Sequence, residues 1–309
     1  MSIGYRLILL SSLLLLGLSV PVFVEMRQPG EASSGGEHYN EASQIGTITD
    51  PSLAEVSGMT PARTAKELWW VHNDSGGKPN IYLINSTGKF AGQFVVTGAT
   101  NRDWEDIASG PGRGGTPSLF IADIGDNARK YDGYAIYRVK EPNLRKGRLS
   151  GATEPAETLR FRYPDGKHDA EALFVDPQSG RPYIVTKKMT PPCSVYRFPL
   201  PLRPGETVTL EKVPGHAVDL ISKLMMVTGA AASPDGTRLI VRSYFTAVEI
   251  TKNPSSPFET IFNNSPQIIK IPLERQGEAI SYTLDGKALV MTSEKLPAPI
   301  FYMNRLPDR

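Results

Sequence analysis

Residues 169–176 read DAEALFVD, and this short stretch contains the pattern on which the whole chain is built. A start of acidic and small residues leads into three apolar residues, and a turn then leads to a second apolar run over 183–186. Related stretches, each followed by its own apolar run, occur at 53–59, 103–108 and 276–282, and a copy without the glutamate occurs at 227–232.

The spacing of the copies indicates a structural repeat. The marker glutamates are Glu55, Glu105, Glu171 and Glu278. The first two steps are 50 and 66 residues long, and the third, 107 residues, equals two steps with the degenerate copy between them. A period of this size made of short strands predicts an all-β chain folded as a β-propeller. Helical repeats have similar periods, but these segments are too short and too often broken by Gly and Pro.

The repeats divide into five four-stranded blades, which together form a domain over residues 44–309. The fifth repeat lacks an outer strand, and a spare strand at 44–49 precedes the first repeat. We expect this N-terminal strand to pair with the last blade and close the ring, because closure removes unpaired sheet edges. Six blades remain the alternative, since the segments 140–157 and 213–226 are long enough to contain further strands.

Composition excludes some classes of function. The 309 residues carry a net charge of +2, so no nucleic-acid partner held by bulk electrostatics is expected. The single cysteine, Cys193, excludes an intramolecular disulfide framework and a cysteine-based zinc site.

The beginning of the chain predicts export. Arg6 is followed by an apolar run over residues 7–24, which has the pattern of a signal peptide and is also just long enough to span a bilayer. Residues 1–25 are therefore either a cleaved signal peptide or a retained membrane anchor, and residues 26–43 read as a flexible linker. We expect a periplasmic, extracellular or outward-facing membrane-anchored protein.

Topology predicts where the polar residues of the repeats meet. In an antiparallel hairpin the start of one strand lies beside the end of the next, so the glutamates and the ends of the second strands should share one mouth of the central channel. The residues expected around this mouth are Glu55, Glu105, Asp106, Glu171 and Glu278 from the inner strands, and Asn73, Asp74, Asp123, Asp126, Lys187, Lys188, Arg242 and Glu294 from the second strands.

Crowded carboxylates repel each other unless they take up protons or a cation. Oxygen ligands without a histidine cluster suit Ca²⁺, and the scattered positions of the four histidines argue against a zinc site. Lys187, Lys188 and Arg242 beside a metal would form a site for an anionic ligand. The alternative is structural: the glutamates bond backbone N–H groups of the neighbouring blade, the cations pair with the glutamates, and residues 123–127 form an Asx turn.

Six motifs together resemble a group of exported bacterial propellers of the TolB-like and phytase-like kind, over about residues 45–305. They are HNDSGG at 72–77, DWEDIA at 103–108, DIGDN at 123–127, DAEAL at 169–173, SPDG at 233–236 and QGEAI at 276–280. The phytase-like branch implies Ca²⁺ and hydrolysis of phosphate esters. By this resemblance, the metal ligands or the base that activates water would be Glu105, Asp106, Asp123, Asp126, Glu171 and Glu278. Glu171 and Glu105 are the catalytic candidates, and Lys187 and Arg242 would hold the phosphate.

Three hypotheses follow. The first is an exported propeller whose mouth binds Ca²⁺ together with a small-molecule, polymeric or protein ligand. The second is a metal-dependent phosphoesterase at the same mouth. The third is a metal-free interaction scaffold.

Overall fold

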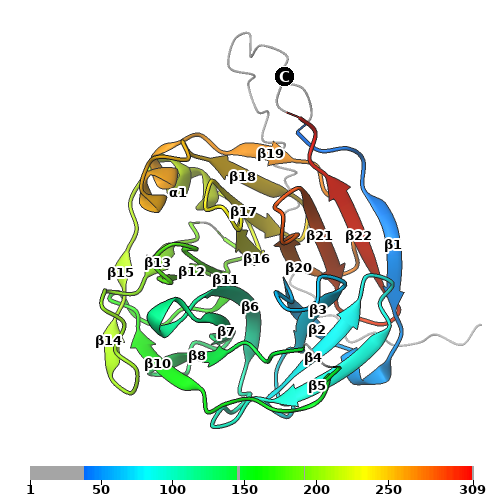
Figure 1. The fold of residues 1–309 in the computed structure, drawn as a ribbon. Helices are drawn as coiled ribbons and strands as arrows, with labels where there is room; N and C mark the ends of the chain where they lie inside the picture. The colour runs from blue at the N-terminus through cyan, green and yellow to red at the C-terminus, as the bar shows by residue number, and fades with distance from the viewer. Residues whose placement is uncertain (1–37, 145–146, 191, 308–309) are drawn as a thin grey trace, which may run out of the picture. The chain divides into compact units, whose positions relative to one another are not determined.

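The computed structural model describes residues 38–144, 147–190 and 192–307. The predicted signal peptide or anchor and most of the predicted linker lie outside the described residues. Five mainly antiparallel sheets stand around a common axis and form a five-bladed β-propeller, which confirms the predicted fold (Figure 1). Among the described residues, no helix has the length and the apolar composition needed to cross a membrane.

The first two blades each carry an additional short outer strand that runs parallel to its neighbour. From the axis outward, blade 1 consists of β2 (Val56–Pro61), β3 (Leu68–Asn73), β4 (Asn80–Asn85), β5 (Phe90–Val95) and β9 (Gly151–Ala152). Blade 2 consists of β6 (Trp104–Pro111), β7 (Pro117–Asp123), β8 (Tyr134–Lys140), β10 (Glu157–Arg162) and β14 (Thr207–Thr209).

The other three blades have four strands each. Blade 3 consists of β11 (Ala170–Val175), β12 (Pro182–Thr186), β13 (Val195–Arg197) and β15 (Glu211–Lys212), and blade 4 of β16 (Val227–Ala232), β17 (Arg238–Ser243), β18 (Ala247–Thr251) and β19 (Gln267–Ile269). Blade 5 consists of β20 (Gly277–Tyr282), β21 (Ala288–Ser293), β22 (Ala298–Asn304) and the N-terminal strand β1 (Ser43–Ile48). The antiparallel pairing of β1 with β22 confirms the predicted closure of the ring.

Neither long connection adds a sixth blade. Residues 140–157 contain β9, which extends blade 1, and residues 213–226 contain the helix α1 (His216–Ile221). The remaining helical turns are η1 (Pro51–Leu53), η2 (Arg113–Gly115) and η3 (Phe258–Asn263).

The hydrophobic core consists of five clusters, and each cluster fills the space between two neighbouring blades. Between blades 1 and 2, for example, Trp70 and Trp104 are both fully buried. Apolar side chains alternate along the strands, so both faces of a blade bury them against a neighbour. The packing therefore fixes the rotation of each blade about the axis and the ends of the inner strands around the channel.

The channel has two ends. The inner strands β2, β6, β11, β16 and β20 begin at one end, which we call the mouth end, and finish at the other, the turn end, where hairpins lead into the second strands.

The first described residues lie at the turn end, where Tyr39 bridges to Arg305 beyond the end of β22. The Tyr39 hydroxyl donates to Glu249 Oε1 at 2.5 Å, and this fully buried carboxylate also accepts bonds from Tyr282 and Arg305. The last residues of the predicted linker are therefore packed against blades 4 and 5.

Candidate functional site

Each inner strand has a register shift at the same place near its beginning. The shifts lie between Val56 and Gly58, Trp104 and Asp106, Ala170 and Ala172, Val227 and Gly229, and Gly277 and Ala279. The five bulged residues are therefore Ser57, Glu105, Glu171, Thr228 and Glu278. A β-bulge re-aims the side chain of the extra residue, and here it repeats around the axis at the mouth end.

This register corrects the alignment of Glu55 with the other three glutamates. Ser57, two residues later, occupies the equivalent position in blade 1. The Glu55 side chain is half exposed and lies 3.6 Å from Lys295 Nζ, at the edge of the mouth end. The copy that lacks its glutamate has Thr228 at the bulge, as the sequence pattern indicated.

The two hydroxyl residues among the bulges join neighbouring blades. Ser57 Oγ donates to Glu105 O at 2.6 Å, and Thr228 Oγ1 donates to Gly277 O at 2.9 Å. Each bond links one blade to the next, so these two positions have a structural role. The three glutamates make no such bond to a backbone group in the described part of the chain.

Six carboxylates gather at the mouth end, and we call this group the acidic mouth. Its members are Asp74, Asp103, Glu105, Glu171, Glu278 and Glu294. Burial raises the pKa of every one of them, and repulsion between neighbours adds to this effect for most. The pKa values of Asp74 and Glu278 are both raised to about 7.

One half of the acidic mouth is internally bonded. Lys187 Nζ donates to Glu171 Oε1 and contacts the Tyr244 hydroxyl at 3.3 Å. Tyr244 in turn donates to Glu278 Oε1 at 2.9 Å, while Glu278 Oε2 is buried without a partner among the described residues. Burial acts against the charge of Lys187, but Glu171 and Glu278 outweigh it and raise the pKa of this lysine.

The other half of the acidic mouth has carboxylate oxygens that accept no hydrogen bond from the described residues. Glu105 is 5% exposed and accepts no hydrogen bond from the residues that the structure describes, and Asp74 Oδ1 is buried without a partner. One oxygen each from Asp74, Asp103 and Glu105 lie within 4.8 Å of one another. Gly125 covers this group closely, and a Cβ there would overlap the carboxylates of Glu105 and Asp103.

Asp106 lies deeper in the channel and has a different role. Its Oδ1 accepts from its own neighbour Ile107 N at 2.8 Å, and its Oδ2 accepts from Leu173 N at 2.8 Å and Ala230 N at 3.4 Å. One carboxylate thereby joins the inner strands of blades 2, 3 and 4. Asp106 thus has the structural role that the sequence left open as an alternative, in which a carboxylate bonds backbone N–H groups of neighbouring blades.

Two further metal candidates are engaged in local structure. Asp123 accepts from Asp103 N at 2.9 Å, and Asp126 accepts from the backbone N–H groups of Lys130 and Tyr131 and from the Tyr134 hydroxyl. Asp126 therefore organises the turn after β7, as the Asx-turn alternative expected.

The predicted ligand-binding residues are not brought together into one anion site. Arg242 is fully buried, donates to Ala279 O at 2.9 Å and pairs with the equally buried Glu274 at 3.0 Å. Lys187 is bound to Glu171, whereas Lys188 lies on the following loop beside Cys193. Asn73 donates to Ser52 O at 2.7 Å, while Asp74 belongs to the acidic mouth.

Sequence reasoning missed Asp103 and Tyr244 as members of this site, whereas Glu294 was expected there with the other ends of the second strands. The signal for Asp103 was present, because it stands two residues before Glu105, as Asp169 stands before Glu171. Tyr244 and Glu294 directly follow β17 and β21, at the position that Asp74 and Lys187 occupy after β3 and β12.

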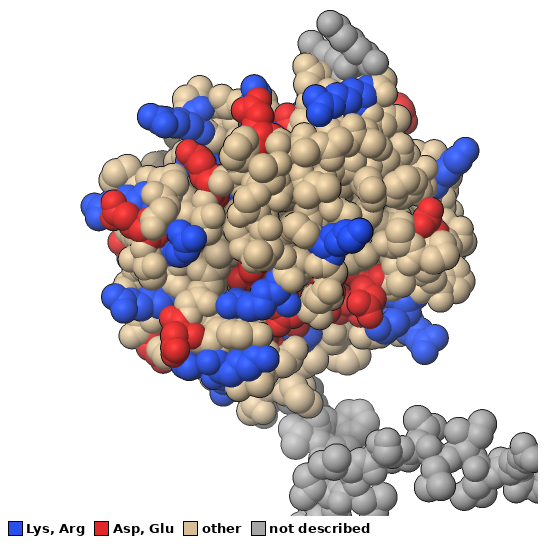
Figure 2. Space-filling view, turned by 90° about the horizontal axis from the view of Figure 1, so that it is seen from below, with Lys and Arg blue, Asp and Glu red and all other residues tan. Residues whose placement is uncertain are grey.

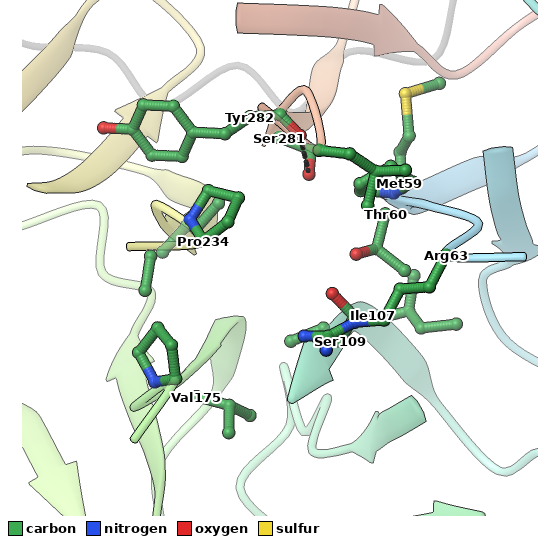
Figure 3. A pocket seen from close by; sticks show the side chains of 16 residues that line it. Met59, Thr60, Arg63, Ile107, Ser109, Val175, Pro234, Ser281 and Tyr282 are labelled. Atoms are coloured by element: carbon green, nitrogen blue, oxygen red, sulfur yellow. Dashed lines mark hydrogen bonds between the residues drawn. The ribbon is translucent and has the colours of Figure 1, made fainter. Parts of the chain in front are cut away.

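The turn end of the channel holds a cavity of about 180 Å³, which we call the turn-end cavity. All five blades contribute to its lining, and Figure 3 shows Thr60, Ser109, Val175, Pro234 and Ser281 arranged around the open centre. In contrast to the acidic mouth, no carboxylate lines this cavity within the described part of the chain.

The outer surface has no comparable concentration of charge on the face seen in Figure 2, where acidic and basic side chains are interspersed. No family model matches the chain, and no curated protein is significantly similar to it. The acidic mouth is therefore the feature on which a functional argument can be built.

Proposed function

We propose that the acidic mouth binds one calcium ion through Asp74, Asp103 and Glu105 and presents it to a ligand outside the cytoplasm. The observation that carries this proposal is the buried Glu105 carboxylate, which has no hydrogen-bond donor among the described residues. A buried carboxylate without a partner is costly, and a cation removes that cost.

The donor set fits calcium better than other common ions. All three groups offer oxygen, and oxygens within 4.8 Å of one another can share one ion at the usual Ca²⁺–O distance of about 2.4 Å. Glu171 and Glu278 add negative charge next to the site. Dissociation constants of about 10⁻⁴ to 10⁻³ M are typical of extracellular calcium modules, which matches the predicted export.

The phosphoesterase hypothesis has less support. A phosphate would need free cationic groups beside the metal, yet Arg242 is committed to Glu274 and Ala279, and Lys187 to Glu171. We therefore favour cation-dependent binding over hydrolysis at this mouth.

Calorimetric titration of the full chain with CaCl₂ tests the proposal. We expect one saturable site for the wild type and at least a tenfold weaker affinity for Glu105→Gln, which keeps the shape but removes the charge. Glu206→Gln, at an exposed turn, is the matched control and should bind as the wild type does. Absence of saturable heat up to about 10 mM Ca²⁺, above the range of extracellular modules, would show that the carboxylates hold protons instead.

A further inference from the structure

Exposed apolar side chains cluster on one side of the mouth end. Of the five most exposed large apolar side chains in the described part of the chain, four lie on loops of blades 3 to 5 at this end. We call them the apolar rim: Leu273 (80% exposed), Met189 (75%), Phe245 (66%) and Met225 (49%). A contiguous exposed apolar area beside polar groups is typical of an interaction site.

The loops of the apolar rim are tied to each other and to the acidic mouth. Met226 N donates to Lys188 O at 3.0 Å, which holds the loop of Met225 beside the loop of Met189. The ion pair of Arg242 with Glu274 holds the loop of Leu273 beside the end of β17.

Phe245 is connected to the acidic mouth through its neighbour Tyr244. The two rings are in edge contact, with centroids 6.4 Å apart, and the Tyr244 hydroxyl bonds Glu278. Through Phe245 and Tyr244 the apolar rim therefore adjoins the acidic mouth.

Backbone geometry also singles out this end. Four described residues other than glycine have a positive φ angle, namely Arg129, Met226, Gln276 and Lys295, and all four lie on loops at the mouth end. Such conformations cost of order 1 kcal/mol or more each and tend to concentrate where loops are shaped for binding.

We propose that the apolar rim and the acidic mouth together form a docking surface for an extended segment of a partner protein, in which one Lys or Arg is flanked by apolar side chains. The cation of the segment would be attracted by the acidic mouth, where six carboxylates face two bonded ammonium groups, Lys187 on Glu171 and Lys295 at 3.7 Å from Glu294. The apolar flanks would cover Phe245 and Leu273, and methionines at 189 and 225 can adapt to different side chains.

This docking surface does not depend on calcium. The proposed ion would lie on blades 1 and 2, whereas the apolar rim belongs to blades 3 to 5. A bound ion would neutralise carboxylates of blades 1 and 2 and leave Glu278, which Tyr244 links to the apolar rim, for the basic group of the segment.

Fluorescence anisotropy with labelled octapeptides tests the proposal on the full chain, with and without Ca²⁺. The probe peptide has one Lys between two Leu-Phe pairs. One comparison peptide has Glu in place of Lys, and the other has Ser in place of the four apolar residues. We expect binding of the Lys peptide below about 1 mM and at least tenfold weaker binding of both comparison peptides.

The double variant Phe245→Ser/Leu273→Ser should weaken binding of the Lys peptide at least tenfold. Ile268→Ser is the matched control, because Ile268 is 67% exposed but lies on the outer strand β19, and it should change the affinity less than twofold. Far-ultraviolet circular dichroism of each variant establishes that the propeller is intact.

Three results would overturn the proposal. The first is absence of binding of the Lys peptide at about 1 mM, and the second is equal binding of the Lys and Glu peptides. The third is Phe245-dependent sedimentation with phosphatidylcholine vesicles, or self-association, without peptide binding, since the rim would then face a lipid surface or a second copy. Calcium binding is measured separately, so failure here leaves the calcium proposal standing.

Discussion

The two ends of the central channel are built from the same five strands and yet differ in chemistry. At the mouth end a bulge in each inner strand aims one side chain at the axis, and three of these five are glutamates. At the turn end the strands run straight into hairpins, and hydroxyl, proline and small apolar side chains, together with Arg63, surround a cavity of about 180 Å³. The backbone repeats fivefold, while the side chains at the bulges determine which end carries the carboxylates that can bind a cation.

Asp106 marks the boundary between the two ends. Equivalent positions in the other blades are Gly58, Ala172, Gly229 and Ala279, and the space left by these small residues accommodates a single carboxylate. At Gly58, a Cβ would approach Ile107 N to 2.7 Å, so the inner strands meet closely here. The mouth end and the turn end should therefore respond separately to substitution.

The largest expected effect compares two arginines at opposite ends of β17. Arg242→Met at the mouth end should destabilise the fold by about 3 to 5 kcal/mol, because it leaves Glu274 buried without its partner. Arg238→Met at the turn end should cost only about 1 to 2 kcal/mol, because Arg238 donates to the neutral Gly286 O and covers the Tyr282 ring. Its ionic partner Asp235, 3.9 Å away, is exposed and remains hydrated without the arginine. Urea unfolding monitored by tryptophan fluorescence measures both.

The double variant Arg242→Met/Glu274→Met is the control for this comparison. It should recover most of the stability lost in the single variant, because no orphaned charge remains. Equal losses in the Arg242 and Arg238 single variants would contradict the difference drawn between the two ends.

A smaller effect is expected from pH. The pKa of Asp74 is raised to about 7 by burial and by Asp103 and Glu294, so between pH 4 and 7 the folded protein holds a proton that the unfolded chain releases. This contribution to stability is present below pH 4 and is lost as the pH rises through 7. In the presence of a chelator, Asp74→Asn should therefore gain about 2 kcal/mol relative to the wild type between pH 5 and 8, after allowance for its partial exposure.

Asp285→Asn is the turn-end counterpart. The Thr283 hydroxyl and Lys287 N–H lower the pKa of Asp285, so its effect on stability should be constant above pH 5. His72 and the titrating groups away from Asp74 are common to each pair and cancel in the difference. Asp74→Asn also removes the repulsion that raises the pKa of Glu105, and this change adds to the expected gain. A stability difference between Asp74→Asn and wild type that is the same at pH 5 and pH 8 would mean that Asp74 titrates normally.

The smallest effect is expected in the turn-end cavity. Ser109→Ala removes a partly buried hydroxyl that makes no hydrogen bond to a described residue, and it should change the unfolding free energy by less than about 0.5 kcal/mol. It should also leave the calcium affinity unchanged. A clear loss of calcium binding in this variant would show that the two ends are coupled through Asp106.

The sequence predicted the fold in detail because each strand carries its own alternating pattern and each turn its own signal. The five blades and the closing strand at 44–49 follow from these local patterns, and the structure confirms both. The outermost strands depart from a strict one-repeat, one-blade division: residues 207–209 pair with β10 of blade 2, and only Glu211–Lys212 pair within blade 3. Such short edge strands are decided by neighbouring blades, which the local sequence does not describe.

The site was predicted less well, for two physical reasons. A bulge shifts the register by one residue without a composition of its own, so Glu55 was aligned where Ser57 stands. Which buried charges form ion pairs is decided only when the blades pack. Nothing near Arg242 in the sequence indicates that its guanidinium would pair with Glu274, 32 residues later. The general position of Glu105, Glu171 and Glu278 followed from hairpin topology, whereas the bonds of Asp106, Asp123 and Asp126 did not.

The contact of Tyr39 with Glu249 has a practical consequence for orientation. The chain enters the domain at the turn end, and whatever precedes residue 38 is joined there. A tether at that point, whether a membrane anchor or a sensor chip, would attach the protein at its turn end and leave the acidic mouth facing the surrounding solution. N-terminal immobilisation is thus the natural format for measuring what this surface captures.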